Sequence, residues 1–77
     1  MKLKEFLEAY CDKDMGVDVT DDWGEDYTIQ YHGSVERLLK YPDIYAEELK
    51  RKVKRLDTAE DVDYDTVLMI LVSNKDV

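Results

Sequence analysis

The sequence has few of the residues on which most catalytic and metal sites depend. Its 77 residues include one cysteine, one histidine, one proline and three glycines, and its longest apolar run covers only residues 67–72. One cysteine excludes an intramolecular disulfide framework, and six apolar residues are too few to cross a membrane. The N-terminus also differs from a secretory or transit peptide, so we expect a cytoplasmic protein without membrane attachment.

The shortage of nucleophiles and bases predicts that the chain has no catalytic residues and is not an enzyme. Cys11 follows Leu7 by four residues near the end of an expected helix, which is typical of a small buried hydrophobic side chain. His32 ends an expected strand beside Gly33, and we interpret it as a surface or capping residue. No pattern in the sequence brings the thiol and the imidazole together.

Motifs for metals and phosphates are incomplete. Residues 61–65 have the Asp-x-Asp-x-Asp start of a calcium loop, but Thr66 stands where the loop needs glycine and Val72 where it needs glutamate. A structural zinc site built from Cys and His ligands is not available, because the chain has one Cys and one His. The glycines are spaced 8 and 9 residues apart, unlike a nucleotide-binding loop. We therefore predict no metal site and no cofactor.

The hydrophobic pattern predicts one α+β domain over residues 1–77, with residues 74–77 as a frayed tail. The helical stripes and the strand alternation are short and are separated by glycine, proline or acidic residues. The expected elements are a helix over 2–11, strands over 17–20 and 27–32, a helix from Ser34 as N-cap to Tyr41-Pro42, a helix from Asp43 as N-cap, and an interior strand over 64–73.

The segment from Asp43 to Leu56 supports two interpretations. Helical spacing of its apolar residues and two favourable i, i+4 ion pairs favour a helix to at least residue 50. Alternatively, residues 51–57 form a strand that pairs with the last strand. The polar stretch 57–63 is expected to be a loop. The predicted order is αββααβ, with a three-stranded, or in the alternative four-stranded, mostly antiparallel sheet and helices on one face.

Charge is the most informative feature of the sequence. Nineteen acidic residues against 11 basic ones give a net charge of −8, which disfavours direct binding to nucleic acid and favours a basic partner. Seven acids lie within residues 12–26 and five within 57–65, and the cluster Lys50-Arg51-Lys52-Lys54-Arg55 lies between the two segments. The ordinary interpretation of such runs is a solvated surface.

A more specific hypothesis is that the acidic segments mimic the phosphates of a nucleic acid. Carboxylates on a rigid surface can form charge-assisted hydrogen bonds with the lysines and arginines of a nucleic-acid-binding protein. Trp23 is either an aromatic anchor of this interface or a cover of the sheet. The predicted contact residues are Asp18, Asp21, Asp22, Trp23, Glu25 and Asp26, followed by Asp61, Asp63 and Asp65.

The basic cluster has three interpretations. It is the polar face of a helix, a contact with RNA, or one half of a charge-complementary homodimer. So small a chain buries a modest share of its surface, so a second copy or a partner would add stability. The candidate self-association residues are Lys50, Arg51, Lys54 and Arg55.

The order of motifs also resembles a known group of proteins. The matching features are the opening Lys2-Leu3-Lys4-Glu5-Phe6-Leu7, a Val-x-Val strand, Tyr31-His32-Gly33-Ser34, Leu38-Leu39 before Pro42, and the final Leu-Met-Ile-Leu-Val strand. This pattern resembles short acidic proteins of Firmicutes phages, prophages and mobile elements.

The resemblance implies an anti-defence role. Some small acidic phage proteins are anti-CRISPR or other inhibitors, which implies binding to a nucleic-acid-binding defence effector in the cytoplasm of a bacterial host. The basic cluster at 50–55 departs from the group, and no functional motif can be transferred residue by residue. The alternative is a structural or regulatory oligomer without enzymatic activity.

Overall fold

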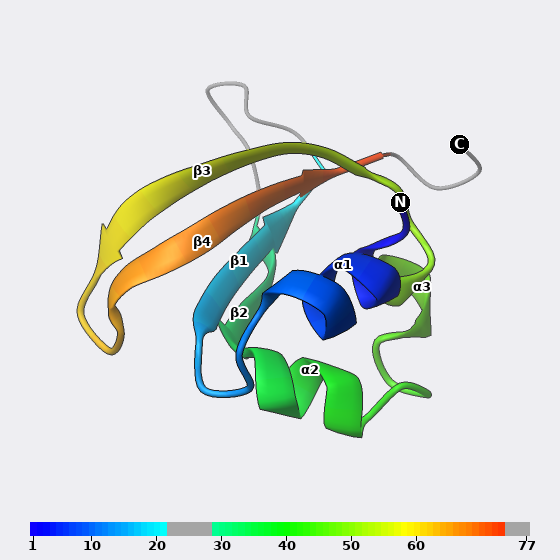
Figure 1. The fold of residues 1–77 in the computed structure, drawn as a ribbon, viewed down its shortest axis with the longest axis horizontal. Helices are drawn as coiled ribbons and strands as arrows, with labels where there is room; N and C mark the ends of the chain where they lie inside the picture. The colour runs from blue at the N-terminus through cyan, green and yellow to red at the C-terminus, as the bar shows by residue number, and fades with distance from the viewer. Residues whose placement is uncertain (22–28, 74–77) are drawn as a thin grey trace.

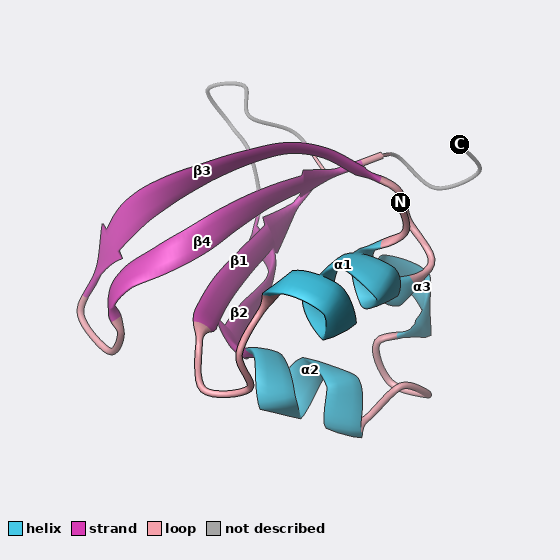
Figure 2. Cartoon of the chain, viewed as in Figure 1, coloured by secondary structure: helices cyan, strands magenta, loops and turns pink. Residues whose placement is uncertain are grey.

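The described part of the chain forms a four-stranded sheet with three short helices on one face (Figures 1 and 2). The computed structural model describes residues 1–21 and 29–73. The predicted α+β class is confirmed. The elements are α1 (Leu3–Tyr10), β1 (Gly16–Thr20), β2 (Ile29–Ser34), α2 (Val35–Lys40), α3 (Ala46–Leu49), β3 (Val53–Asp61) and β4 (Asp65–Val72).

The sheet is mixed, with the strand order β2-β1-β4-β3. β1 pairs antiparallel with β2 and parallel with β4, and β3 and β4 form an antiparallel hairpin. The apolar β4 is therefore an interior strand, as its sequence predicts. The order αββααβ and the three-stranded sheet are wrong, because a fourth strand precedes β4. The alternative with four strands is the correct one.

The segment around residues 50–61 differs most from the sequence prediction. The predicted loop at 57–63 is wrong as far as Asp61, because β3 pairs with β4 along residues 53–61. β3 is an edge strand with mostly exposed side chains. Its sequence therefore needs no alternation of apolar and polar residues. Cross-strand pairing with the apolar β4 decides the conformation of β3. The local sequence pattern of residues 53–61 does not predict this pairing.

The helix expected from Asp43 is also shorter than predicted. α3 covers only Ala46–Leu49, and its N-cap is Tyr45, not Asp43. Arg51 and Lys52 lie beyond the helix end, where they cannot complete the predicted i, i+4 pairs with Glu47 and Glu48. The helix at Ser34 is confirmed, because the Ser34 hydroxyl accepts the backbone N–H of Arg37 at 3.2 Å.

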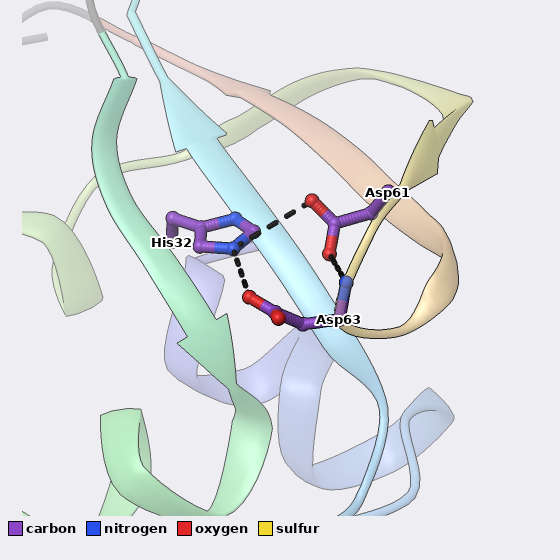
Figure 3. A group of neighbouring side chains, drawn as sticks. All are labelled: His32, Asp61 and Asp63. Carbon is purple, nitrogen blue, oxygen red and sulfur yellow. Dashed lines mark hydrogen bonds and ion pairs between the residues drawn. The ribbon is translucent and has the colours of Figure 1, made fainter.

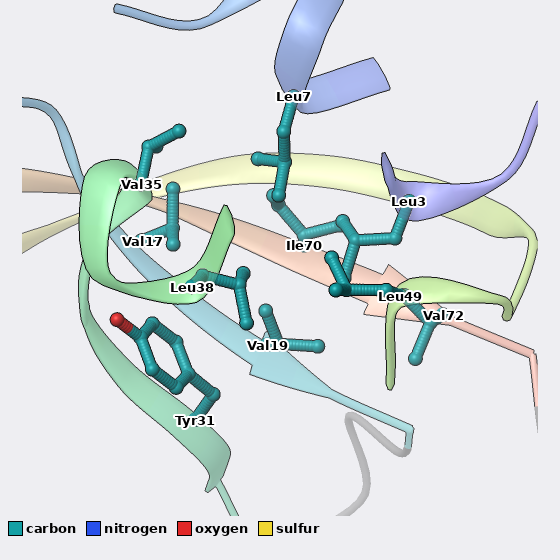
Figure 4. Close-up of a cluster of buried hydrophobic side chains, with 10 residues drawn as sticks. All are labelled: Leu3, Leu7, Val17, Val19, Tyr31, Val35, Leu38, Leu49, Ile70 and Val72. Atoms are coloured by element: carbon teal, nitrogen blue, oxygen red, sulfur yellow. The ribbon is translucent and has the colours of Figure 1, made fainter. Parts of the chain in front are cut away.

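The hydrophobic core lies between the helices and one face of the sheet (Figure 4). In the predicted first helix, Leu3 and Leu7 are fully buried, Phe6 is half-buried and Tyr10 is exposed. Val17 and Val19 of β1 point into the same core. Among the described residues, the buried cluster consists of Leu3, Leu7, Val17, Val19, Tyr31, Val35, Leu38, Leu49, Ile70 and Val72.

The opposite face of β1 is also covered. Gly16, Asp18 and Thr20 alternate with the core valines and are buried as well. The ring of Tyr64, in the turn of the β3–β4 hairpin, lies so close to Gly16 that a Cβ atom there would collide with it. The hairpin turn therefore lies against the helix-free face of β1.

Candidate functional site

A hydrogen bond between His32 and Asp18 forms the base of the candidate site. The β1–β2 register places these two residues opposite each other, and both point to the helix-free face. His32 Nδ1 bonds to Asp18 Oδ1. Because a carboxylate can only accept, Nδ1 carries the proton. Asp18 is 7% exposed, so its carboxylate is committed to this contact.

The turn of the β3–β4 hairpin brings two more carboxylates to the same imidazole (Figure 3). His32 Nε2 lies 3.7 Å from Asp61 Oδ1 and 3.9 Å from Asp63 Oδ2. Asp61 ends β3, and Asp63 lies in the turn. Asp61 and Asp63 follow His32 by 29 and 31 positions in the sequence. The hairpin nevertheless brings both carboxylates to the same ring nitrogen.

Asp61 is held in place from its other side. Its Oδ2 accepts the backbone N–H of Asp63 at 2.9 Å and that of Tyr64 at 3.2 Å. This is the local side-chain-to-backbone bonding that Asp favours in turns. The turn closes at Asp65, which has a positive φ of 62° that Asp tolerates better than most residues. Oδ1 of Asp61 therefore keeps a fixed direction toward His32.

The three carboxylates favour the charged imidazole. The pKa of His32 is raised, and the hydrogen bond to Asp18 is the largest cause. Burial opposes this effect, and the negative charges of Asp18, Asp61 and Asp63 add to it. His32 is thus more than the surface or capping residue that its sequence position suggests, because it joins β2 to the hairpin turn. The Asp-x-Asp spacing at 61–63 was the one local signal of this cluster.

The predicted partner-binding residues fall into three groups. Asp18 is buried and bonded to His32, and Asp21 forms an ion pair with Arg51 at 3.4 Å. Asp61 is half-buried in the His32 cluster, whereas Asp63 and Asp65 are exposed. The remaining four residues, Asp22, Trp23, Glu25 and Asp26, lie outside the described part of the chain.

The predicted self-association residues do not form one helix face. Lys50 pairs with Glu47 at 3.2 Å, and Arg51 is half-buried against Asp21. Lys54 and Arg55 belong to the exposed first half of β3. Charge along β3 is therefore segregated, with basic residues at its start and acidic residues at its end.

The single thiol lies apart from the imidazole. Cys11 caps the end of α1 and packs, half-buried, against the core on the helix side of the sheet. Burial, and secondarily the charge of Asp12, raises the pKa of the thiol. His32 points to the opposite face of the sheet, so the two side chains do not make a catalytic dyad.

Comparisons with known proteins found no match to this chain: no family model matches it, and neither the curated proteins nor the solved structures contain a significant match. In the described residues, no helix has the length and apolar character needed to cross a membrane.

Proposed function

We propose that this chain is an inhibitory binding protein whose acidic β3–β4 hairpin occupies the nucleic-acid groove of a basic partner. The partner class is a nucleic-acid-binding defence effector of a bacterial host. The resemblance to small acidic phage proteins supports this class, and it makes an anti-CRISPR role our specific hypothesis.

The observation that carries the proposal is the charge of the exposed hairpin end. Asp57, Glu60, Asp63 and Asp65 are exposed, and residues 56–73 contain no lysine or arginine. Val62 lies in the turn between these carboxylates, and its side chain is 98% exposed. A basic groove would gain charge-assisted hydrogen bonds with the acids and a small apolar contact with Val62.

The rigidity of this end also favours binding. The backbone N–H groups of Asp63 and Tyr64 donate to Asp61 and His32 lies behind it, so the carboxylate of Asp61 is held in one arrangement at the base of the turn. Preorganised charges lose less entropy on binding than mobile ones. Long-range attraction from a chain of net charge −8 would speed the encounter with a basic surface, and added salt would weaken it.

A purified panel of CRISPR effector complexes, with target-DNA cleavage as the readout, tests the proposal. The informative variant is Asp57→Asn/Glu60→Gln/Asp65→Asn, which removes three exposed charges and leaves the His32 cluster intact. Substitution of Asp21 is less suitable, because it would also break the ion pair with Arg51. The matched control is Glu8→Gln/Glu36→Gln/Asp43→Asn, which removes three exposed charges outside the hairpin.

We expect the wild-type chain to inhibit at least one effector, the hairpin variant to lose at least tenfold in potency, and the control to retain it. The loss should shrink at high salt because exposed charges are screened. Equal losses in the two variants would show that net charge, not the hairpin, acts. Absence of inhibition across the panel would contradict the anti-CRISPR hypothesis.

The second candidate function is self-association, favoured by the edge position of β3 in the described sheet. This strand ends the sheet, and its basic first half and acidic second half would be complementary in an antiparallel pair of two copies. Light scattering at micromolar to millimolar concentrations tests it. A dimer that dissociates in high salt supports the pairing, and a monomer at every concentration excludes it.

A further inference from the structure

The His32 cluster contains the donor atoms of a metal site. Nε2 of His32, a carboxylate oxygen of Asp61 and one of Asp63 all lie within 4.8 Å of one another (Figure 3). Ligand bonds to first-row divalent cations are about 2.0–2.2 Å long, so donor atoms around one ion are separated by about 3 Å. Small rotations of the exposed Asp63 side chain and of the imidazole would bring the three atoms to that separation.

The groups that surround these donor atoms orient them as the neighbours of metal ligands do in known metal sites. Metal-binding histidines almost always donate the other ring N–H to a carboxylate or carbonyl, and Asp18 accepts the Nδ1 proton of His32. This bond leaves the lone pair of a neutral imidazole on Nε2, facing Asp61 and Asp63. The backbone bonds to Asp61 Oδ2 orient the other oxygen in the same way.

We propose that His32, Asp61 and Asp63 bind one first-row divalent cation, such as Zn²⁺ or Mn²⁺, with Asp18 as the positioning residue behind the imidazole. One nitrogen and two carboxylate oxygens suit these ions better than Mg²⁺ or Ca²⁺, which prefer oxygen alone. The partial exposure of His32 and Asp63 leaves room for water to complete the coordination.

Bound metal would connect three parts of the chain. β2 contributes His32, the end of β3 contributes Asp61, and the turn contributes Asp63. The ion would fix the hairpin turn against the sheet and neutralise part of its charge. This inference goes beyond the proposed function, because it concerns the isolated chain and needs no partner.

Titration calorimetry and NMR of the full chain test the site. ZnCl₂ and MnCl₂ are the probes, and MgCl₂ is the comparison. Because His32 is the only histidine, its imidazole resonances are unambiguous. We expect one equivalent of Zn²⁺ to bind with a micromolar dissociation constant and to shift these resonances, and Mn²⁺ to broaden them. Mg²⁺ should bind at least tenfold more weakly.

Five variants separate ligation from general electrostatic attraction. Asp63→Asn and His32→Gln should each lose at least tenfold in Zn²⁺ affinity. Asp18→Asn should lose about 10–100-fold, because the carboxylate that orients the imidazole is lost. Asp65→Asn is the matched control, because it removes one charge from the same turn and asparagine also tolerates a positive φ. Cys11→Ser should bind normally.

Several results would overturn the inference. Among them are Zn²⁺ affinity no tighter than millimolar, equal losses in Asp63→Asn and Asp65→Asn, and loss of binding in Cys11→Ser. Metal binding does not require inhibition of an effector, and the hairpin variant used for inhibition leaves all three ligands in place. Failure of the metal site is therefore distinguishable from failure of the proposed function.

Discussion

The imidazole of His32 and the carboxylate of Asp18 are hydrogen-bonded directly across the β1–β2 ladder, on the face of the sheet that the helices leave open. This pair is one point at which the hairpin turn contacts the rest of the sheet, and the ring of Tyr64 against Gly16 is another. Asp61 and Asp63 approach the same imidazole from the turn, so one imidazole faces three carboxylates. The stability of the arrangement should therefore depend on the protonation of His32.

The first prediction concerns pH in the presence of a metal chelator. The folded-state pKa of His32 is raised above its ordinary value of 6.5. The added stability is therefore fully present below about pH 6.5 and is lost as the pH rises through the folded-state pKa. Urea denaturation at pH 6 and pH 8.5 should show a larger loss of stability for wild type than for His32→Gln. The same loss in both proteins would mean that other groups cause it.

A second prediction concerns Gly16 and the ring of Tyr64. Gly16→Ala should destabilise the chain by about 1–3 kcal/mol, because the new methyl group collides with the ring and the hairpin turn must shift. Denaturant unfolding measures the change. In the background of Tyr64→Ser the same substitution should cost much less. Equal costs in both backgrounds would show that the ring is not the cause.

Leu7 provides a test of the core. This side chain is fully buried between α1 and the sheet, so Leu7→Ala should reduce the free energy of unfolding by about 2–5 kcal/mol. Ile44→Ala is the control, because Ile44 is 70% exposed and its truncation should change stability by about 0.5 kcal/mol or less. Thermal or urea unfolding followed by circular dichroism gives both values.

The thiol of Cys11 should react slowly in the native chain. Its pKa is raised above 9.0 by burial and by the charge of Asp12, which lowers the thiolate fraction at pH 8. We expect the Cys11 thiol to react with a disulfide reagent more slowly in the native chain than in the chain unfolded by urea. Asp12→Asn should increase the native rate, but by less than unfolding does, because burial is the larger cause. A native rate equal to the unfolded rate would contradict the burial argument.

Much of the fold follows from local patterns. The stripe that includes Leu3 and Leu7 predicts the first helix, and the N-cap at Ser34 with Pro42 beyond predicts the second. The apolar run at 67–72 predicts an interior strand, which β4 is. These features succeed because each element carries its own periodicity and its own end signals.

The secondary structure predicted for residues 43–61 was wrong in part for a physical reason. Its helical spacing and i, i+4 charge pairs contribute only about 0.2–0.5 kcal/mol per pair. Pairing with β4 outweighs them, and α3 ends at Leu49. An exposed edge strand has no buried face to generate a recognisable alternation. The sequence alone therefore left helix and strand unresolved over residues 51–57 and wrongly predicted a loop for the rest of β3.

The sequence by itself determined the α+β class, the acidity of the chain and the shortage of catalytic side chains. Only the tertiary structure decided that His32 meets Asp18, Asp61 and Asp63, and that Asp18 is therefore buried in a contact and not presented to a partner. The physical reason is distance along the chain. Residues 14 to 45 positions apart come together through strand pairing and the curvature of a hairpin, and neither leaves a local signature.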